Sequence, residues 1–94
     1  MKQILLVVLD LKGPAGHYAP LYAFLQTFQW AHYTNPIWFI ETLKTPQEIT
    51  DELQRFILQG DHFFITKLQQ PYQGVLPNAA WDWTNLRLHG KTFR

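Results

Sequence analysis

The hydrophobic pattern of the chain begins with six consecutive apolar residues, Ile4 to Leu9, followed by Asp10 and a loop rich in glycine and proline. An apolar run of this length, rich in branched side chains and bounded by turn residues, is typical of a strand buried on both faces. Alternate side chains point to opposite faces of a strand, so both faces of this one need a cover. Asp10 then lies at the strand exit, where it either carries a functional role or only ends the strand.

Two segments with other patterns follow this strand. Apolar residues recur at helical spacing from Tyr18 to Phe28 and predict an amphipathic helix, with Pro20 in its first turn. Residues 30–42 hold two aromatic and β-branched runs on either side of Asn35-Pro36, which predicts a hairpin.

The second half of the chain repeats the alternation of helix and strand. Thr45-Pro46-Gln47-Glu48 combines a capping box with proline at the first helical position, and predicts a helix that stops at Gly60. Residues 61–68 carry bulky side chains at both parities and predict a last long strand. Residues 71–74 are expected to form a turn, and a short helix is expected to start near Asn78.

The order strand, helix, strand, strand, helix, strand predicts an α+β fold, a ferredoxin-like βαββαβ sandwich with a short C-terminal helix. Right-handed crossovers place both main helices on one face of the sheet. The C-terminal segment with Trp81 and Trp83 covers part of the other face, and a second copy of the chain covers the rest. Residues 1–94 are expected to form one ferredoxin-like domain, with residues 87–94 as a frayed tail.

Composition strengthens the expectation of a homodimer. Hydrophobic residues are 47% of the 94 residues and charged residues only 16%, against about 25% charged residues in an ordinary globular chain. The net charge of +1 excludes a general basic field of the kind that drives strong non-specific nucleic-acid binding. The absence of cysteine excludes disulfides, thiolate metal sites and a cysteine nucleophile. The apolar run is too short to span a membrane and has no signal cleavage site, so we expect a cytoplasmic protein without a membrane partner.

Candidate chemistry centres on Asp10. Magnesium is typically held by one or two carboxylates, water and substrate phosphate, and a two-fold axis would supply two copies of Asp10. Asp10 is therefore the candidate catalytic residue and metal ligand, with Mg²⁺ as the cofactor if the protein is an enzyme. Lys12 is either a phosphate contact or a solvated loop lysine, and His17 is either a nucleic-acid contact or base, or a residue of the helix start. The four histidines share no metal-ligand spacing, and the aromatic residues Trp38, Trp81 and Trp83 are more typical of a core or dimer interface than of base stacking.

Several motifs resemble one family across about the first 83 residues. They are Leu9-Asp10-Leu11-Lys12 followed by Gly-Pro-Ala-Gly-His-Tyr and Leu21-Tyr22; Trp30-Ala31-His32-Tyr33 with Ile37-Trp38-Phe39-Ile40; and Gly74-Val75-Leu76-Pro77 with Ala80-Trp81-Asp82-Trp83. This set is similar to the CRISPR-associated protein two superfamily, and most similar to its small SinR-like proteins. The resemblance implies a ferredoxin-like homodimer in which an acid at the end of the first strand, here Asp10, lies near the dimer axis. In some members this acid serves metal-dependent phosphodiester cleavage, and other members are non-catalytic DNA-holding adaptors.

Two functions therefore follow from the sequence. The first is a homodimer associated with nucleic acid, possessing Mg-dependent endonuclease activity at paired Asp10 residues. The alternative is a non-catalytic interaction or adaptor module that binds a protein partner and has no nuclease activity. The low charge favours the second function, and the position of Asp10 favours the first.

Overall fold

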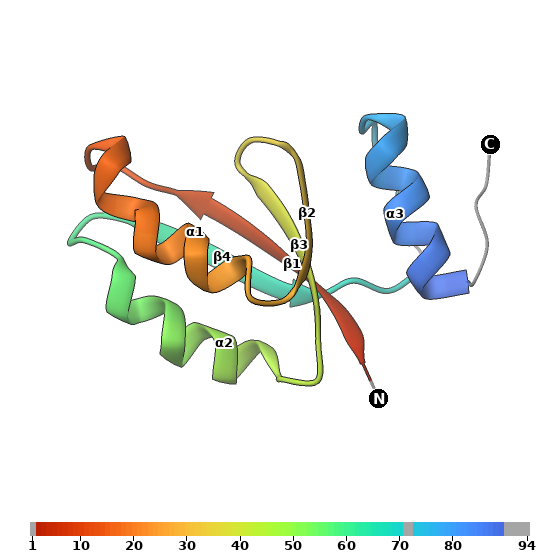
Figure 1. Ribbon diagram of the computed structural model, residues 1–94, viewed down its shortest axis with the longest axis horizontal. Helices are drawn as coiled ribbons and strands as arrows, with labels where there is room; N and C mark the ends of the chain where they lie inside the picture. Colours follow the sequence, from red (N-terminus) through yellow and green to blue (C-terminus); the bar gives the residue numbers. More distant parts are fainter. Residues whose placement is uncertain (1, 71–72, 90–94) are drawn as a thin grey trace.

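The computed structural model of the protein describes residues 2–70 and 73–89. Its architecture is α+β, with one four-stranded antiparallel sheet and three α-helices, which is compatible with a small ferredoxin-like fold (Figure 1). The strands and helices, in chain order, are β1 (Gln3–Asp10), α1 (Ala19–Leu25), β2 (Gln29–Thr34), β3 (Ile37–Thr42), α2 (Pro46–Leu53), β4 (His62–Lys67) and α3 (Asn78–His89). Short 3₁₀ segments precede α1 (Ala15–Tyr18) and follow α2 (Gln54–Phe56).

The sheet has the strand order β2-β3-β1-β4, so β1 is central and β2 and β4 are the edges. Strand β1 pairs antiparallel with both β3 and β4, with Val8 opposite Ile37 on one side and Phe64 on the other. The hairpin of β2 and β3 turns at Asn35-Pro36, as predicted, and its register is interrupted between Ala31 and Thr34.

Helices α1 and α2 cover one face of the sheet (Figure 1). The alternate β1 residues Leu5, Val7 and Leu9 are at most 5% exposed and form the centre of this layer. They pack against the following buried side chains of α1, α2 and their flanking segments: Tyr18, Leu21, Leu25, Ile49 and Leu53. The capping box at the start of α2 is confirmed, because Thr45 Oγ1 accepts from Glu48 N at 3.1 Å while Glu48 Oε1 accepts from Thr45 N at 2.9 Å.

Helix α3 lies on the opposite face of the sheet (Figure 1). Ala80 is fully buried and packs in one cluster with Ile4, Ala31 and Phe39 from three strands. The C-terminal segment thus covers the second face of the sheet, as its aromatic content predicted. Its cover is partial: α3 packs mainly on β2 and β1, and Phe64 of β4 stays 65% exposed on the same face.

The end of α2 differs from the sequence expectation. Helix α2 ends at Leu53, well before Gly60, because the chain passes through a 3₁₀ turn and becomes extended at Ile57. Gly60 has a positive φ of 93° and belongs to the turn before β4, where glycine tolerates that conformation.

The C-terminal helix is longer than the sequence predicted. Residues 87–89, which were expected in a frayed tail, are helical, and residues 90–94 lie outside the described part of the chain. Arg87 explains the extension, because its guanidinium lies 4.0 Å from the ring centre of Trp83 and its Nε lies 3.7 Å from Glu41 of β3. Of the expected turn at residues 71–74, the first two residues also lie outside the described residues.

The contact of Ala80 with the sheet leads to a stability prediction. Substituting Ala80→Glu places a charge in a fully buried position, and we expect it to release α3 and to lower the unfolding free energy by about 2 kcal/mol or more. The matched control Ala79→Glu, at the exposed neighbouring position, should change stability by less than about 0.5 kcal/mol. Urea unfolding followed by tryptophan fluorescence checks both variants, and equal stability of the two would contradict the docking of α3.

Candidate acid site at the end of β1

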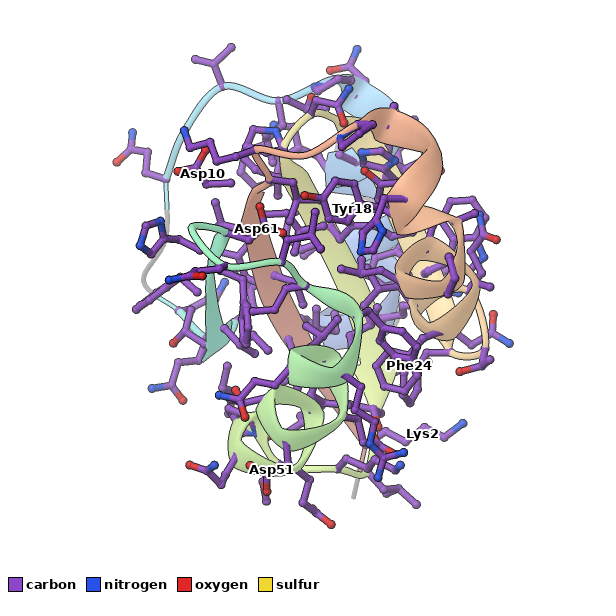
Figure 2. All side chains as sticks on the ribbon, turned by 90° about the vertical axis from the view of Figure 1, so that its left-hand side faces the viewer. Lys2, Asp10, Tyr18, Phe24, Asp51 and Asp61 are labelled. Atoms are coloured by element: carbon purple, nitrogen blue, oxygen red, sulfur yellow. The ribbon has the colours of Figure 1, made fainter. Side chains whose placement is uncertain are left out.

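Asp10 is the last residue of β1, and its carboxylate reaches solvent (Figure 2). The Asp10 side chain is 58% exposed, and its Oδ1 lies 3.0 Å from Lys12 Nζ. His62, the residue opposite Asp10 on β4, brings its Nδ1 to 3.9 Å from Asp10 Oδ2. The strand exit therefore presents an acid, an ammonium group and an imidazole within reach of one another.

A second acid, Asp61, lies at the same end of the molecule and is buried (Figure 2). Its Oδ1 accepts a hydrogen bond from Lys12 N at 2.7 Å, and its Oδ2 accepts one from Leu58 N at 2.7 Å. The Tyr18 hydroxyl lies 2.9 Å and 2.8 Å from the two oxygens and donates to this carboxylate. Asp61 thus joins the loop after β1, the start of the first helical segment and the turn before β4.

Gly13 completes this network. Its N–H donates to the Tyr18 hydroxyl oxygen at 2.8 Å. A Cβ on this residue would lie 2.5 Å from Leu58 Cδ1 and 2.8 Å from the Tyr18 hydroxyl. A larger residue at position 13 would therefore have to displace the end of the Leu58 side chain and the hydrogen-bonded Tyr18 hydroxyl.

The hydrogen-bond network shifts the pKa values of Asp61 and Tyr18. Burial raises the pKa of Asp61, but hydrogen bonds from Lys12 N, Leu58 N and Tyr18, together with the charge of His17, outweigh burial and lower this pKa below its ordinary value of 3.8. The pKa of Tyr18 is raised above 10.0, first by burial and then by its hydrogen bond to Asp61. Asp61 is accordingly an anion and Tyr18 a neutral donor across the physiological range, which suits a structural role.

The predicted site residues do not all come together. Lys12 contacts Asp10, whereas His17 lies in the 3₁₀ segment, packs edge-on against Tyr18 at 5.1 Å, and makes no recorded contact with Asp10 or Lys12 among the described residues. The described residues also contain no group of three or more histidine, aspartate or glutamate side chains that could hold a metal ion.

Sequence reasoning overlooked Asp61 and Tyr18 as partners at this end of the sheet. A signal was present in the predicted topology. If β4 pairs antiparallel with β1, the residue just before β4 must lie beside the residue just after β1. The observed register, with Asp10 opposite His62, places Asp61 next to the loop that begins at Leu11.

The Asp61 network predicts a specific pH dependence of stability. Because folding lowers the pKa of Asp61, its stabilisation is present above the unfolded pKa near 3.8 and disappears as pH falls through the lower folded value. In Asp61→Asn, one backbone N–H must face an amide NH₂, because Lys12 N and Leu58 N bond to different oxygens. We expect Asp61→Asn to melt about 5 °C or more below the wild type at pH 7, with the gap narrowing below pH 4.

Calorimetry or circular dichroism over this pH range measures the effect. The control variant Asp51→Asn, on the exposed face of α2, should melt with the wild type at every pH. A gap for Asp61→Asn that stays constant down to pH 2 would contradict the assigned role.

Comparisons with known proteins add no family to this geometry: no family model matches the chain, and no curated protein or solved structure is significantly similar to it. No helix in the described ranges is long and apolar enough to cross a membrane.

Proposed function

We propose that the protein is a cytoplasmic, ferredoxin-like homodimer of the CRISPR-associated protein two type, which cleaves phosphodiester bonds with a divalent metal ion held by the two copies of Asp10. The observation that supports this proposal is an uncovered apolar patch beside Asp10. Val8 and Phe64 face each other across β1 and β4, and Phe64 is 65% exposed. We call this pair the Val8–Phe64 patch.

The position of this patch connects dimerisation with the acid site. Val8 and Asp10 are two residues apart on β1, so their side chains point to the same face of the sheet. Phe64 and His62 have the same relation on β4, and His62 lies opposite Asp10. A two-fold axis that buries the Val8–Phe64 patch would therefore bring two copies of Asp10 to the rim of one interface.

A homodimer would supply a second Asp10 carboxylate beside the first. Two carboxylates together with water and a substrate phosphate match the usual coordination of Mg²⁺. Such an ion would activate water and neutralise charge on the phosphate. Lys12, which is 62% exposed beside Asp10, would contribute an ammonium group for a neighbouring phosphate.

A second candidate function is a non-catalytic adaptor that uses the same dimer surface to bind a protein. The ion pair of Asp10 with Lys12 supports it, because each acid already has a compensating charge within its own chain. The two functions share the homodimer and differ in the role of Asp10.

Dimerisation is tested at Phe64. We expect the wild type to sediment as a dimer and Phe64→Lys to sediment as a folded monomer, because the exposed ring is replaced by a charge that resists burial. Tyr33→Lys, at a 48% exposed aromatic residue on the far edge strand, is the matched control and should remain dimeric. Analytical ultracentrifugation decides the question, and a monomeric wild type at high protein concentration would remove the proposed site.

Catalysis is tested at Asp10. With Mg²⁺ or Mn²⁺ and a pool of RNA and DNA, we expect the wild type to cleave and Asp10→Ala to be slower by about 100-fold or more. The surface variant Asp51→Ala should cleave at the wild-type rate, and a chelator should stop all cleavage. Equal rates for Asp10→Ala and wild type, or a dimeric wild type that cleaves nothing, would exclude the nuclease and leave the adaptor.

A further inference from the structure

A hollow lined by aromatic side chains lies between α1 and the edge strand β2, on the sheet face that α1 covers. Its volume is about 320 Å³. Its walls are formed by Tyr22 of α1, Gln26 at the C-terminal cap of α1, Trp30 and His32 of β2, and Trp38 of β3. We call it the aromatic groove. It is distinct from the Asp10 site, because Asp10 and its neighbours do not line it.

The rings of the groove already form a stack. Tyr22 and His32 each lie nearly parallel to Trp38, with interplanar angles of 14° and ring centres 5.8 Å and 4.2 Å away. Trp30 is tilted by 39° against Trp38 at 5.3 Å. Parallel rings favour the addition of another flat ring, whereas a cage for an ammonium group needs ring faces that converge from different directions.

The exposure of these rings differs sharply. Trp38 is only 3% exposed and belongs to the core, whereas Trp30 is 41% exposed. Trp30 lies on an edge strand and is absent from the buried side chains of both core clusters. A large aromatic surface is thus left open to solvent beside a hollow that a flat molecule can enter.

The polar groups at the groove include an amide, an indole N–H and an imidazole. Neither the Gln26 side-chain amide nor the indole N–H of Trp30 is hydrogen-bonded to a described residue. His32 Nε2 is paired with Asn35 Oδ1 at 2.9 Å, which leaves Nδ1 as its other hydrogen-bonding atom. Among the described residues, no carboxylate, ammonium or guanidinium group lines the groove, so its amide, indole and imidazole suit a heteroaromatic ring with donors and acceptors on its edge.

A smaller hollow of about 230 Å³ adjoins the groove. The two share Tyr22 and Trp38, and the smaller one continues past Asn35 and Pro36 to Leu9 and Leu11, the neighbours of Asp10 in the chain. The smaller hollow thus shares two wall residues with the aromatic groove and is also lined by Leu11, the residue before Lys12.

We propose that the aromatic groove of Tyr22, Trp30, His32 and Trp38 binds a nucleobase, which stacks on Trp30 and hydrogen-bonds to Gln26. Stacking on an aromatic side chain is the usual way in which proteins hold bases without reading their sequence. The base is either that of a free nucleotide or one base of a single strand. This inference stands apart from metal-dependent cleavage, because neither Asp10 nor a metal ion takes part in it.

The test measures binding of adenosine monophosphate and of a short single-stranded oligoadenylate by calorimetry, in the presence of a chelator. We expect Trp30→Ala to weaken binding by about tenfold or more, and Trp30→Phe to retain most of it, because one stacked base contributes about that much affinity. Tyr33→Ala is the matched control, an exposed aromatic residue of the same strand that does not line the groove, and should bind as the wild type does.

Each outcome has a defined meaning. Much tighter binding of the oligonucleotide identifies a single strand as the ligand, and equal molar affinity identifies a free nucleotide; both support the proposal. Failure of both ligands to bind, equal binding of ribose 5-phosphate, preferential binding of choline, or equal losses in Trp30→Ala and Tyr33→Ala would overturn it. Thermal melting of every variant shows that the folds are comparable.

Discussion

The central strand β1 is apolar on both faces, and the rest of the fold depends on covering them. Leu5, Val7 and Leu9 require the layer of α1 and α2, while Ile4 and Leu6 require a layer on the other side. A four-stranded sheet with two crossover helices supplies only the first layer. Helix α3 supplies the second layer. It covers that face of the sheet over β2 and β1 and leaves Phe64 of β4 exposed.

The incomplete cover of the second face bears on the positions of the two proposed sites. The open part of the face is next to the exit of β1, where Asp10 and Lys12 reach solvent. The aromatic groove lies on the opposite face, between α1 and the edge strand β2, where Trp30 is 41% exposed. The Asp10 site thus lies on the face that α3 covers in part, and the aromatic groove lies beside α1 on the other face.

Most of the secondary structure could be predicted from the sequence because its signals are local. The apolar run before Asp10, the capping box at Thr45 and the hairpin around Asn35-Pro36 all depend on neighbouring residues, and the structure contains each of them. Errors arose where a distant contact decides the outcome. The length of α3 depends on the contact of Arg87 with Glu41, and the role of Asp61 depends on strand register, so neither was visible in the pattern of nearby residues. Asp10 lies at the end of β1, as the apolar run predicted, but the hydrogen bonds that Tyr18 makes with Gly13 and Asp61 at the same end of the sheet were not foreseen.

The loop after β1 is anchored by hydrogen bonds to the Asp61 carboxylate. The Asp61 carboxylate is held by two backbone N–H groups and one hydroxyl, inside the protein, whereas the Asp10–Lys12 pair is exposed. Dissolved salt screens exposed charge pairs over about 10 Å at 0.1 M, and it affects buried hydrogen bonds far less. Rising ionic strength, or an arriving anion, can therefore draw the Lys12 ammonium away from Asp10 while the backbone beneath it keeps its position.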